Sequence, residues 1–171
     1  GDYNNDALID IYLGTGGLNE EYLYPNILFK NNGTLNSFSY SKFSNNFSQY
    51  INAVNSVFFD KDLDGDQDLI ITYSGPWMQS NFGTIIYENI LREKADSYYI
   101  RLIGTKTNTY GIGSSIKLVY EDKQYNEKFI NRIISPGSKT GSHPYMAHFG
   151  LNFPYKNLKN IVVNWPTSKQ I

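Results

Sequence analysis

The chain of 171 residues carries 16 acidic and 15 basic side chains, a formal net charge of −1. This balance provides no basic surface for nucleic acid or an anionic membrane, so we expect neither as a partner. It has no cysteine for a disulfide or thiolate chemistry, and no stretch approaches the roughly 20 apolar residues that span a bilayer. We therefore expect no membrane span.

The chain opens with an acidic loop, residues 2–10, in which oxygen-bearing side chains occupy positions 1, 3, 5 and 9. Such a spacing is typical of loops that bind a hard cation through oxygen ligands. We expect weaker binding here than at the second loop described below, because Ala7 stands where glycine is preferred and Asn4 replaces a charged ligand. The candidate metal ligands are Asp2, Asn4, Asp6, Leu8 and Asp10.

Short strands are expected after this loop. Alternating apolar residues at Ile9, Ile11 and Leu13 indicate a half-buried strand. A second strand is predicted over residues 27–30 and a third around residues 38–43. Residues 55–59 then lead into a second acidic loop.

Five of the ten aspartates fall in the second loop, residues 60–68. Carboxylates this close repel one another unless a cation neutralises them. Alternating oxygen ligands with a glycine at the sharp bend suit Ca²⁺, and Gly65 stands at that bend. The alternative interpretation is a solvated acidic turn. The candidate ligands are the side chains of Asp60, Asp62, Asp64 and Asp68, together with the backbone carbonyl of Asp66.

This second loop is not an EF-hand, which needs a bidentate glutamate at position 12 and flanking helices. Position 12 is Ile71, inside an apolar run. The ligand set therefore closes at position 9, and the loop leads into a strand.

The two loops belong to an internal repeat with a constant offset. The offset that aligns Asp2 with Asp60 also aligns the run at 27–31 with the similar run at 85–89, and Gly17 with Gly75. An offset of this size is typical of propellers or solenoids. No strand precedes the first loop, so we expect the chain to be a fragment of a longer protein.

The repeat stops around residues 92–97, where we place a domain boundary. Beyond it, residues 99–103, 115–120, 125–134 and 161–165 are predicted strands separated by glycine and proline turns. Several short strands without a helix favour a small β-sandwich.

The first part resembles FG-GAP/VCBS repeats, the calcium-binding blades of integrin-type β-propellers. The second part has four marks in order, Leu102-Ile103-Gly104-Thr105, Asn108-Thr109-Tyr110-Gly111-Ile112-Gly113-Ser114, His148-Phe149-Gly150-Leu151 and Val163-Asn164-Trp165-Pro166. On these marks it resembles the ASPIC/UnbV domain. It departs from that family at Asn152 and at residues 167–169, where glycine is usual.

The resemblance implies an all-β protein in which propeller blades over residues 1–95 precede a transthyretin-like β-sandwich over residues 96–171. It also implies an extracellular or cell-surface location, either secreted or outer membrane-associated. The expected role is a non-catalytic module for adhesion or for binding a protein or glycan, with structural Ca²⁺ in the acidic loops. A glycan-binding module would use exposed Tyr side chains and Trp77. The alternative is a helper or catalytic domain in a biosynthetic pathway.

The two histidines, His143 and His148, lie in a stretch with no nucleophile-elbow motif and no further metal ligands nearby. We expect His148 to form a hydrogen bond in a turn. Trp165 is expected in the sandwich core or as an anchor at a domain interface. Catalysis is not expected from these residues.

Overall fold

The computed structural model describes residues 1–15, 25–34, 37–41, 52–74, 82–90, 96–106, 108–137, 144–151 and 155–166. Every regular element in these ranges is a β-strand, so the protein is all-β as expected. The chain divides into two compact units: unit 1 comprises residues 1–3 and 8–90, and unit 2 comprises residues 4–7 and 91–171. The predicted domain boundary between residues 95 and 96 stays a prediction. Predictions for Phe43, Trp77, His143, Asn152 and residues 167–169 lie outside the described residues.

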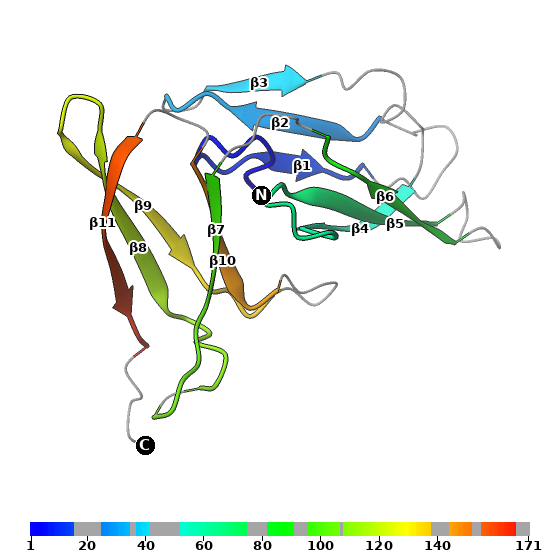
Figure 1. Ribbon diagram of the computed structural model, residues 1–171. Coiled ribbons are helices and arrows are strands. Elements are labelled where there is room, and N and C mark those ends of the chain that lie inside the picture. Colours follow the sequence, from blue (N-terminus) through cyan, green and yellow to red (C-terminus); the bar gives the residue numbers. More distant parts are fainter. Residues whose placement is uncertain are drawn as a thin grey trace. The chain divides into compact units, whose positions relative to one another are not determined.

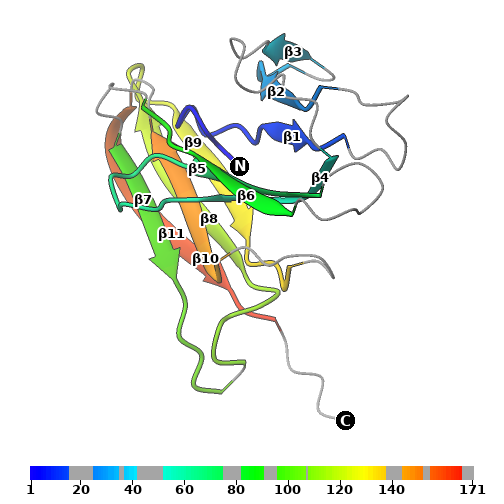
Figure 2. The same ribbon diagram turned by 90° about the vertical axis from the view of Figure 1, so that its right-hand side faces the viewer.

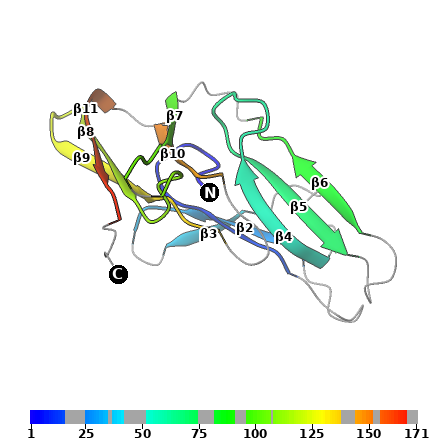
Figure 3. The ribbon, with the colours of Figure 1, turned by 90° about the horizontal axis from the view of Figure 1, so that it is seen from below.

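Unit 1 contains two antiparallel three-stranded sheets in which sequential strands are neighbours (Figure 1). Short runs rich in β-branched and aromatic residues, separated by polar turns, favour this arrangement. In Figure 3 the acidic loop between β4 and β5 lies at one end of the second sheet. The first sheet consists of β1 (Ile11–Leu13), β2 (Ile27–Asn31) and β3 (Phe38–Ser41), and the second of β4 (Asn52–Phe59), β5 (Asp68–Ser74) and β6 (Gly83–Tyr87).

Both sheets contribute to the core of unit 1. Leu28 comes from β2, whereas the buried Leu69 and Ile71 come from β5. The equivalent residues of the first repeat, Ile11 and Leu13, are almost half exposed. The prediction that Ile11 and Leu13 form the buried face of this strand is therefore wrong. Tyr12, which lies between them, is the side chain that packs against the core.

The internal repeat is present in the strand pairing. Ile11 pairs with Phe29 and Leu13 with Ile27, and at the equivalent positions of the second copy Leu69 pairs with Tyr87 and Ile71 with Ile85. The third strand departs from the pattern. The same offset carries β3 onto residues 96–99, which lie in β7 (Asp96–Arg101), and β7 pairs with β10 (Met146–Leu151) in unit 2. The repeat therefore ends at β7, because this strand belongs to a sheet of unit 2.

Unit 2 has two sheets, one of β7 and β10 and the other in the order β11-β8-β9 (Figure 2). Both sheets supply one hydrophobic core, with Phe149 of β10 and Ile116 and Leu118 of β8 almost completely buried. This two-layer arrangement is what the glycine-punctuated strands of the sequence favour. The second sheet consists of β8 (Ser115–Asp122), β9 (Glu127–Ile133) and β11 (Tyr155–Asn164).

Two local predictions in unit 2 are wrong. His148 lies in β10, where it pairs with Tyr99, rather than in a turn. Tyr125 belongs to a turn and has a φ of 64°, so strand β9 begins only at Glu127. The turn forms because the Asp122 carboxylate accepts hydrogen bonds from the backbone N–H groups of Gln124 and Asn126.

Candidate metal centre

The second acidic loop folds back on its first aspartate. The carboxylate of Asp60 accepts hydrogen bonds from the backbone N–H of Asp64 at 3.2 Å and of Gly65 at 3.0 Å. Two residues of the loop have left-handed backbone conformations, Leu63 with a φ of 61° and Gly65 with 98°. Glycine adopts that conformation without steric cost, which explains its place at this bend.

Three aspartates of this loop converge. One carboxylate oxygen from each of Asp60, Asp62 and Asp68 lies within 4.8 Å of the others. Ca²⁺–oxygen bonds of about 2.3–2.6 Å place ligands on opposite sides of the ion about 4.6–5.2 Å apart. The three oxygens are therefore close enough to bind one calcium ion, and their hard, anionic chemistry fits it.

The other two predicted ligands occupy the bend itself. A carboxylate oxygen of Asp64 accepts a hydrogen bond from the backbone N–H of Asp66 at 3.0 Å. A carboxylate has about four lone-pair sites, so this bond leaves capacity on Asp64 for a cation. The roles of Asp64 and of the Asp66 carbonyl as ligands stay predictions.

The last ligand, Asp68, is fixed at the start of β5. Its side chain is 2% exposed. One carboxylate oxygen accepts from the backbone N–H of Lys61 at 2.8 Å, and the other accepts from that of Asn89 at 2.7 Å. Asp68 therefore joins the start of the loop to the chain after β6, and a cation bound to it would hold these segments together.

Lys61 supplies a positive charge at the rim of the site. Its ammonium group lies 3.0 Å from Asp62 and 3.2 Å from Glu88. The hydrogen bond with Lys61 holds the pKa of Asp62 below its usual value, and the same bond raises the pKa of the lysine. Five aspartates and one lysine still leave the loop with a formal charge of −4, which favours a divalent cation.

The first acidic loop has the same backbone conformation. Asn5 and Ala7 have φ values of 56° and 72°, at the positions equivalent to Leu63 and Gly65. An L-residue such as alanine in this conformation costs roughly 1–2 kcal/mol. The expectation that this loop binds a cation less tightly than the second loop stays a prediction.

The ends and the centre of the first loop belong to different units. In unit 1, Asp2 and Asp10 are buried, with exposures of 1% and 2%. In unit 2, the side-chain amide of Asn4 donates to Asp6 at 2.8 Å. A metal site formed by Asp2, Asn4, Asp6, Leu8 and Asp10 stays a prediction.

Two residues of unit 2, Arg132 and Gly150, contact the centre of this loop, and no sequence pattern predicted these contacts. The guanidinium of Arg132 donates to the backbone carbonyls of Ala7 at 2.8 Å and of His148 at 3.1 Å. A β-carbon on Gly150 would collide with the backbone of Asn5, so only glycine permits this close approach. No local pattern marks Arg132, because its partners are backbone atoms of distant segments.

Asn89 links the two loops within unit 1. Its side-chain amide donates to the backbone carbonyls of Tyr3 at 2.6 Å and of Gln67 at 3.1 Å. In addition, the backbone N–H of Asp2 donates to the side-chain oxygen of Gln67 at 2.7 Å. The repeated asparagine at positions 31 and 89 was the sequence signal for this role.

His148 and Trp165 are two further residues that the sequence analysis singled out. His148 is buried, and its ring packs against Tyr99 with a centroid separation of 4.7 Å. Trp165 is 38% exposed, so it does not lie in the sandwich core, and its alternative role as an anchor at a domain interface stays a prediction. It directly follows β11, which ends at Asn164.

Residues 104–171 match the family model described as ASPIC and UnbV. This match supports the ASPIC/UnbV part of the sequence resemblance, whereas the resemblance of the first part to FG-GAP/VCBS repeats stays a prediction. No curated protein matches the chain. Within the described residues, no helix has the length and apolar character that crossing a membrane requires.

Proposed function

We propose that this chain is a non-catalytic, calcium-stabilised module of an extracellular or cell-surface protein. In this proposal residues 1–95 are FG-GAP/VCBS-type propeller blades. The ASPIC/UnbV domain that follows them is transthyretin-like, and the module serves adhesion or the binding of a protein or glycan. The ion is Ca²⁺, and its role is structural.

The observation that carries the proposal is the convergence of carboxylate oxygens from Asp60, Asp62 and Asp68. These residues lie at the end of β4 and the start of β5, and Asp68 is also bonded to the chain after β6. A cation here would neutralise the repulsion within the loop and tie three strand ends together. Metal binding and folding are then linked, because the unfolded chain does not preserve this arrangement.

The surroundings of the loop favour calcium over catalysis. All predicted ligands are oxygen atoms, which suit a hard cation. The buried Asp68 is held by two backbone N–H groups, an arrangement that fixes the orientation of its carboxylate. Millimolar extracellular calcium would saturate even weak sites of this kind, which supports a location outside the cell.

Thermal unfolding in calcium and in chelator tests the proposal. We expect calcium to raise the melting temperature of the chain, and Asp60→Asn to remove most of that rise. Glu127→Gln, which removes one exposed carboxylate from β9, is the charge-matched control and should keep the full rise. An identical melting curve with calcium and with chelator would refute the structural role of the ion.

A further inference from the structure

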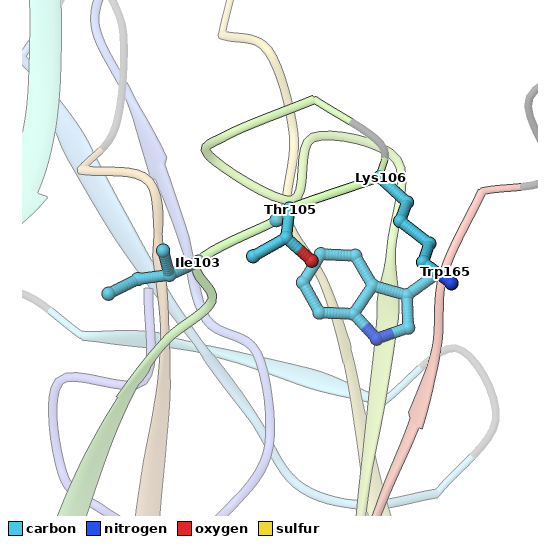
Figure 4. A pocket seen from close by; sticks show the side chains of 5 residues that line it. Ile103, Thr105, Lys106 and Trp165 are labelled. Atoms are coloured by element: carbon cyan, nitrogen blue, oxygen red, sulfur yellow. The ribbon is translucent and has the colours of Figure 1, made fainter.

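A pocket of about 350 Å³ opens in unit 2 beside Trp165. Figure 4 shows the side chains of Thr105 and Lys106 extending from one loop toward the indole ring. Ile103 and the backbone of Gly104 complete the lining. The pocket thus combines an aromatic face, a hydroxyl and an ammonium group, all accessible from solvent.

The loop that carries Thr105 and Lys106 is braced by its own hydrogen bonds. The backbone N–H of Gly104 donates to the carbonyl of Thr109 at 3.0 Å. The Asn108 side chain accepts from the backbone N–H of Ile112 at 2.6 Å and donates to the carbonyl of the same residue at 2.9 Å. A pocket held in this way is largely formed before its ligand arrives, which lowers the entropic cost of binding.

The other wall of the pocket lies near a glycine turn. Gly113 has a φ of 87°, and a β-carbon there would lie 3.6 Å from Pro166, the residue after Trp165. The N–H of Gly113 also donates to the carbonyl of Ile134 at 2.8 Å. Three segments far apart in the sequence therefore meet next to Trp165 at this end of unit 2.

The charge of unit 2 favours an anionic ligand. Unit 1 contains ten acidic and three basic residues, a balance of −7, whereas unit 2 contains six acidic and twelve basic residues, a balance of +6. The net charge of −1 for the whole chain conceals this separation. A positive unit attracts anions over several ångströms and raises their rate of association.

We propose that this pocket binds an acidic saccharide, a sugar carrying a carboxylate group. The C–H face of a pyranose ring suits the negative face of the indole. Thr105 can form a hydrogen bond with a sugar hydroxyl, and the ammonium of Lys106 can pair with the carboxylate. The inference rests on the binding role proposed above and gives it a place and a ligand class.

A nucleic acid is the less favoured polyanion. Proteins that bind single strands stack successive bases on several aromatic side chains along a basic groove. The pocket offers one indole and one lysine, a set that matches a single sugar residue with one charge. The titration described below distinguishes a nucleic acid from an acidic saccharide.

Calorimetric titration of the full chain tests the assignment. The probe is an oligosaccharide that alternates glucuronic acid with N-acetylglucosamine, and the comparison is the same oligosaccharide with its carboxyl groups reduced to alcohols. We expect the acidic form to bind about tenfold tighter, as the loss of one charge pair predicts. Equal affinity for the two forms, or no binding of either, would overturn the proposal.

Variants locate the site. Trp165→Ala and Lys106→Gln should each weaken binding about tenfold, and Lys106→Arg should retain it. Lys123→Gln removes the same charge from an exposed turn and should have no effect. Unchanged affinity in both pocket variants, or equally tight binding of an oligothymidylate of the same charge, would refute the assignment. Because the calcium-induced rise in melting temperature is measured on the same samples, failure of saccharide binding is distinguished from failure of the calcium proposal.

Discussion

Asp10 and Asp68 make the same two hydrogen bonds in two copies of one loop. Asp10 accepts from the backbone N–H of Tyr3 and of Asn31, and Asp68 accepts from the equivalent residues of the second copy, Lys61 and Asn89. Both carboxylates are 2% exposed. The repeat therefore extends from the amino-acid pattern to individual hydrogen bonds. The last aspartate of each loop is buried and connects the start of its loop to the residue 21 positions further along the chain.

The left-handed backbone conformation at the bend of each loop can be tested by one substitution in each loop. Ala7→Gly should stabilise the chain by about 1 kcal/mol, because it relieves a left-handed conformation that disfavours a β-carbon. Gly65→Ala should destabilise it by a similar amount. Urea unfolding gives both values from the shift in midpoint. The interpretation fails if the two substitutions change stability in the same direction.

Asn89 should contribute more to stability than its counterpart Asn31. Asn89→Ala removes two part-buried hydrogen bonds to backbone carbonyls, and we expect a loss of about 2 kcal/mol. Asn31→Ala is the matched control, since its side-chain bonds to Ile9 and Gly33 are exposed. It should cost less than half as much. Equal losses in chemical denaturation would contradict a special linking role for Asn89.

Arg132 should hold residues 4–7 through the fork geometry of its guanidinium. Arg132→Lys keeps the charge but cannot reproduce two divergent hydrogen bonds, so we expect a loss of about 1–2 kcal/mol. Amide NMR signals of residues 4–7 should shift in this variant and also in Gly150→Ala. Arg101→Lys, on the exposed face of β7, should leave those signals unchanged. Signals that stay in place in both test variants would show that the contact is absent in solution.

A carboxylate on β8 should make unit 2 sensitive to acid. A hydrogen bond from Asn157 and a smaller effect of the hydrogen bond from Lys159 hold the pKa of Glu121 below its ordinary value of 4.5. The stabilisation from Glu121 is therefore complete above the pKa of the unfolded chain and is lost as the pH falls through the lower pKa of the folded chain. Melting temperatures measured from about pH 6 to pH 3 should show Glu121→Gln less stable than the wild type at the upper end. The two proteins should converge at the lower end, and a constant difference would contradict this assignment.

The sequence was sufficient for features encoded locally. Most strands followed from short apolar runs between turn residues, and the loop at Asp60 followed from its spacing of aspartates and its glycine. The constant offset identified the two copies, and their strand pairing and loop backbone conformation agree in the structure. These features depend on residues close together in the chain or on their exact repetition.

Features that depend on distant partners were not predictable. Strand β10 has no clear alternation and is stabilised by pairing with β7, which lies far from it in sequence. The separation of charge between the units was hidden in the net charge. The exposure of Trp165 depends on where β11 ends relative to the loop at Thr105, and no local pattern records that placement.

Calorimetric titration of chelator-treated protein with calcium tests the central claim most directly. Wild type should take up calcium at the loop of Asp60, and Asp60→Asn combined with Asp68→Asn should abolish that binding event while unit 2 stays folded by NMR. Any event that remains belongs to the weaker first loop. Absence of calcium binding to wild type at millimolar concentration, or full binding by the double variant, would contradict the account.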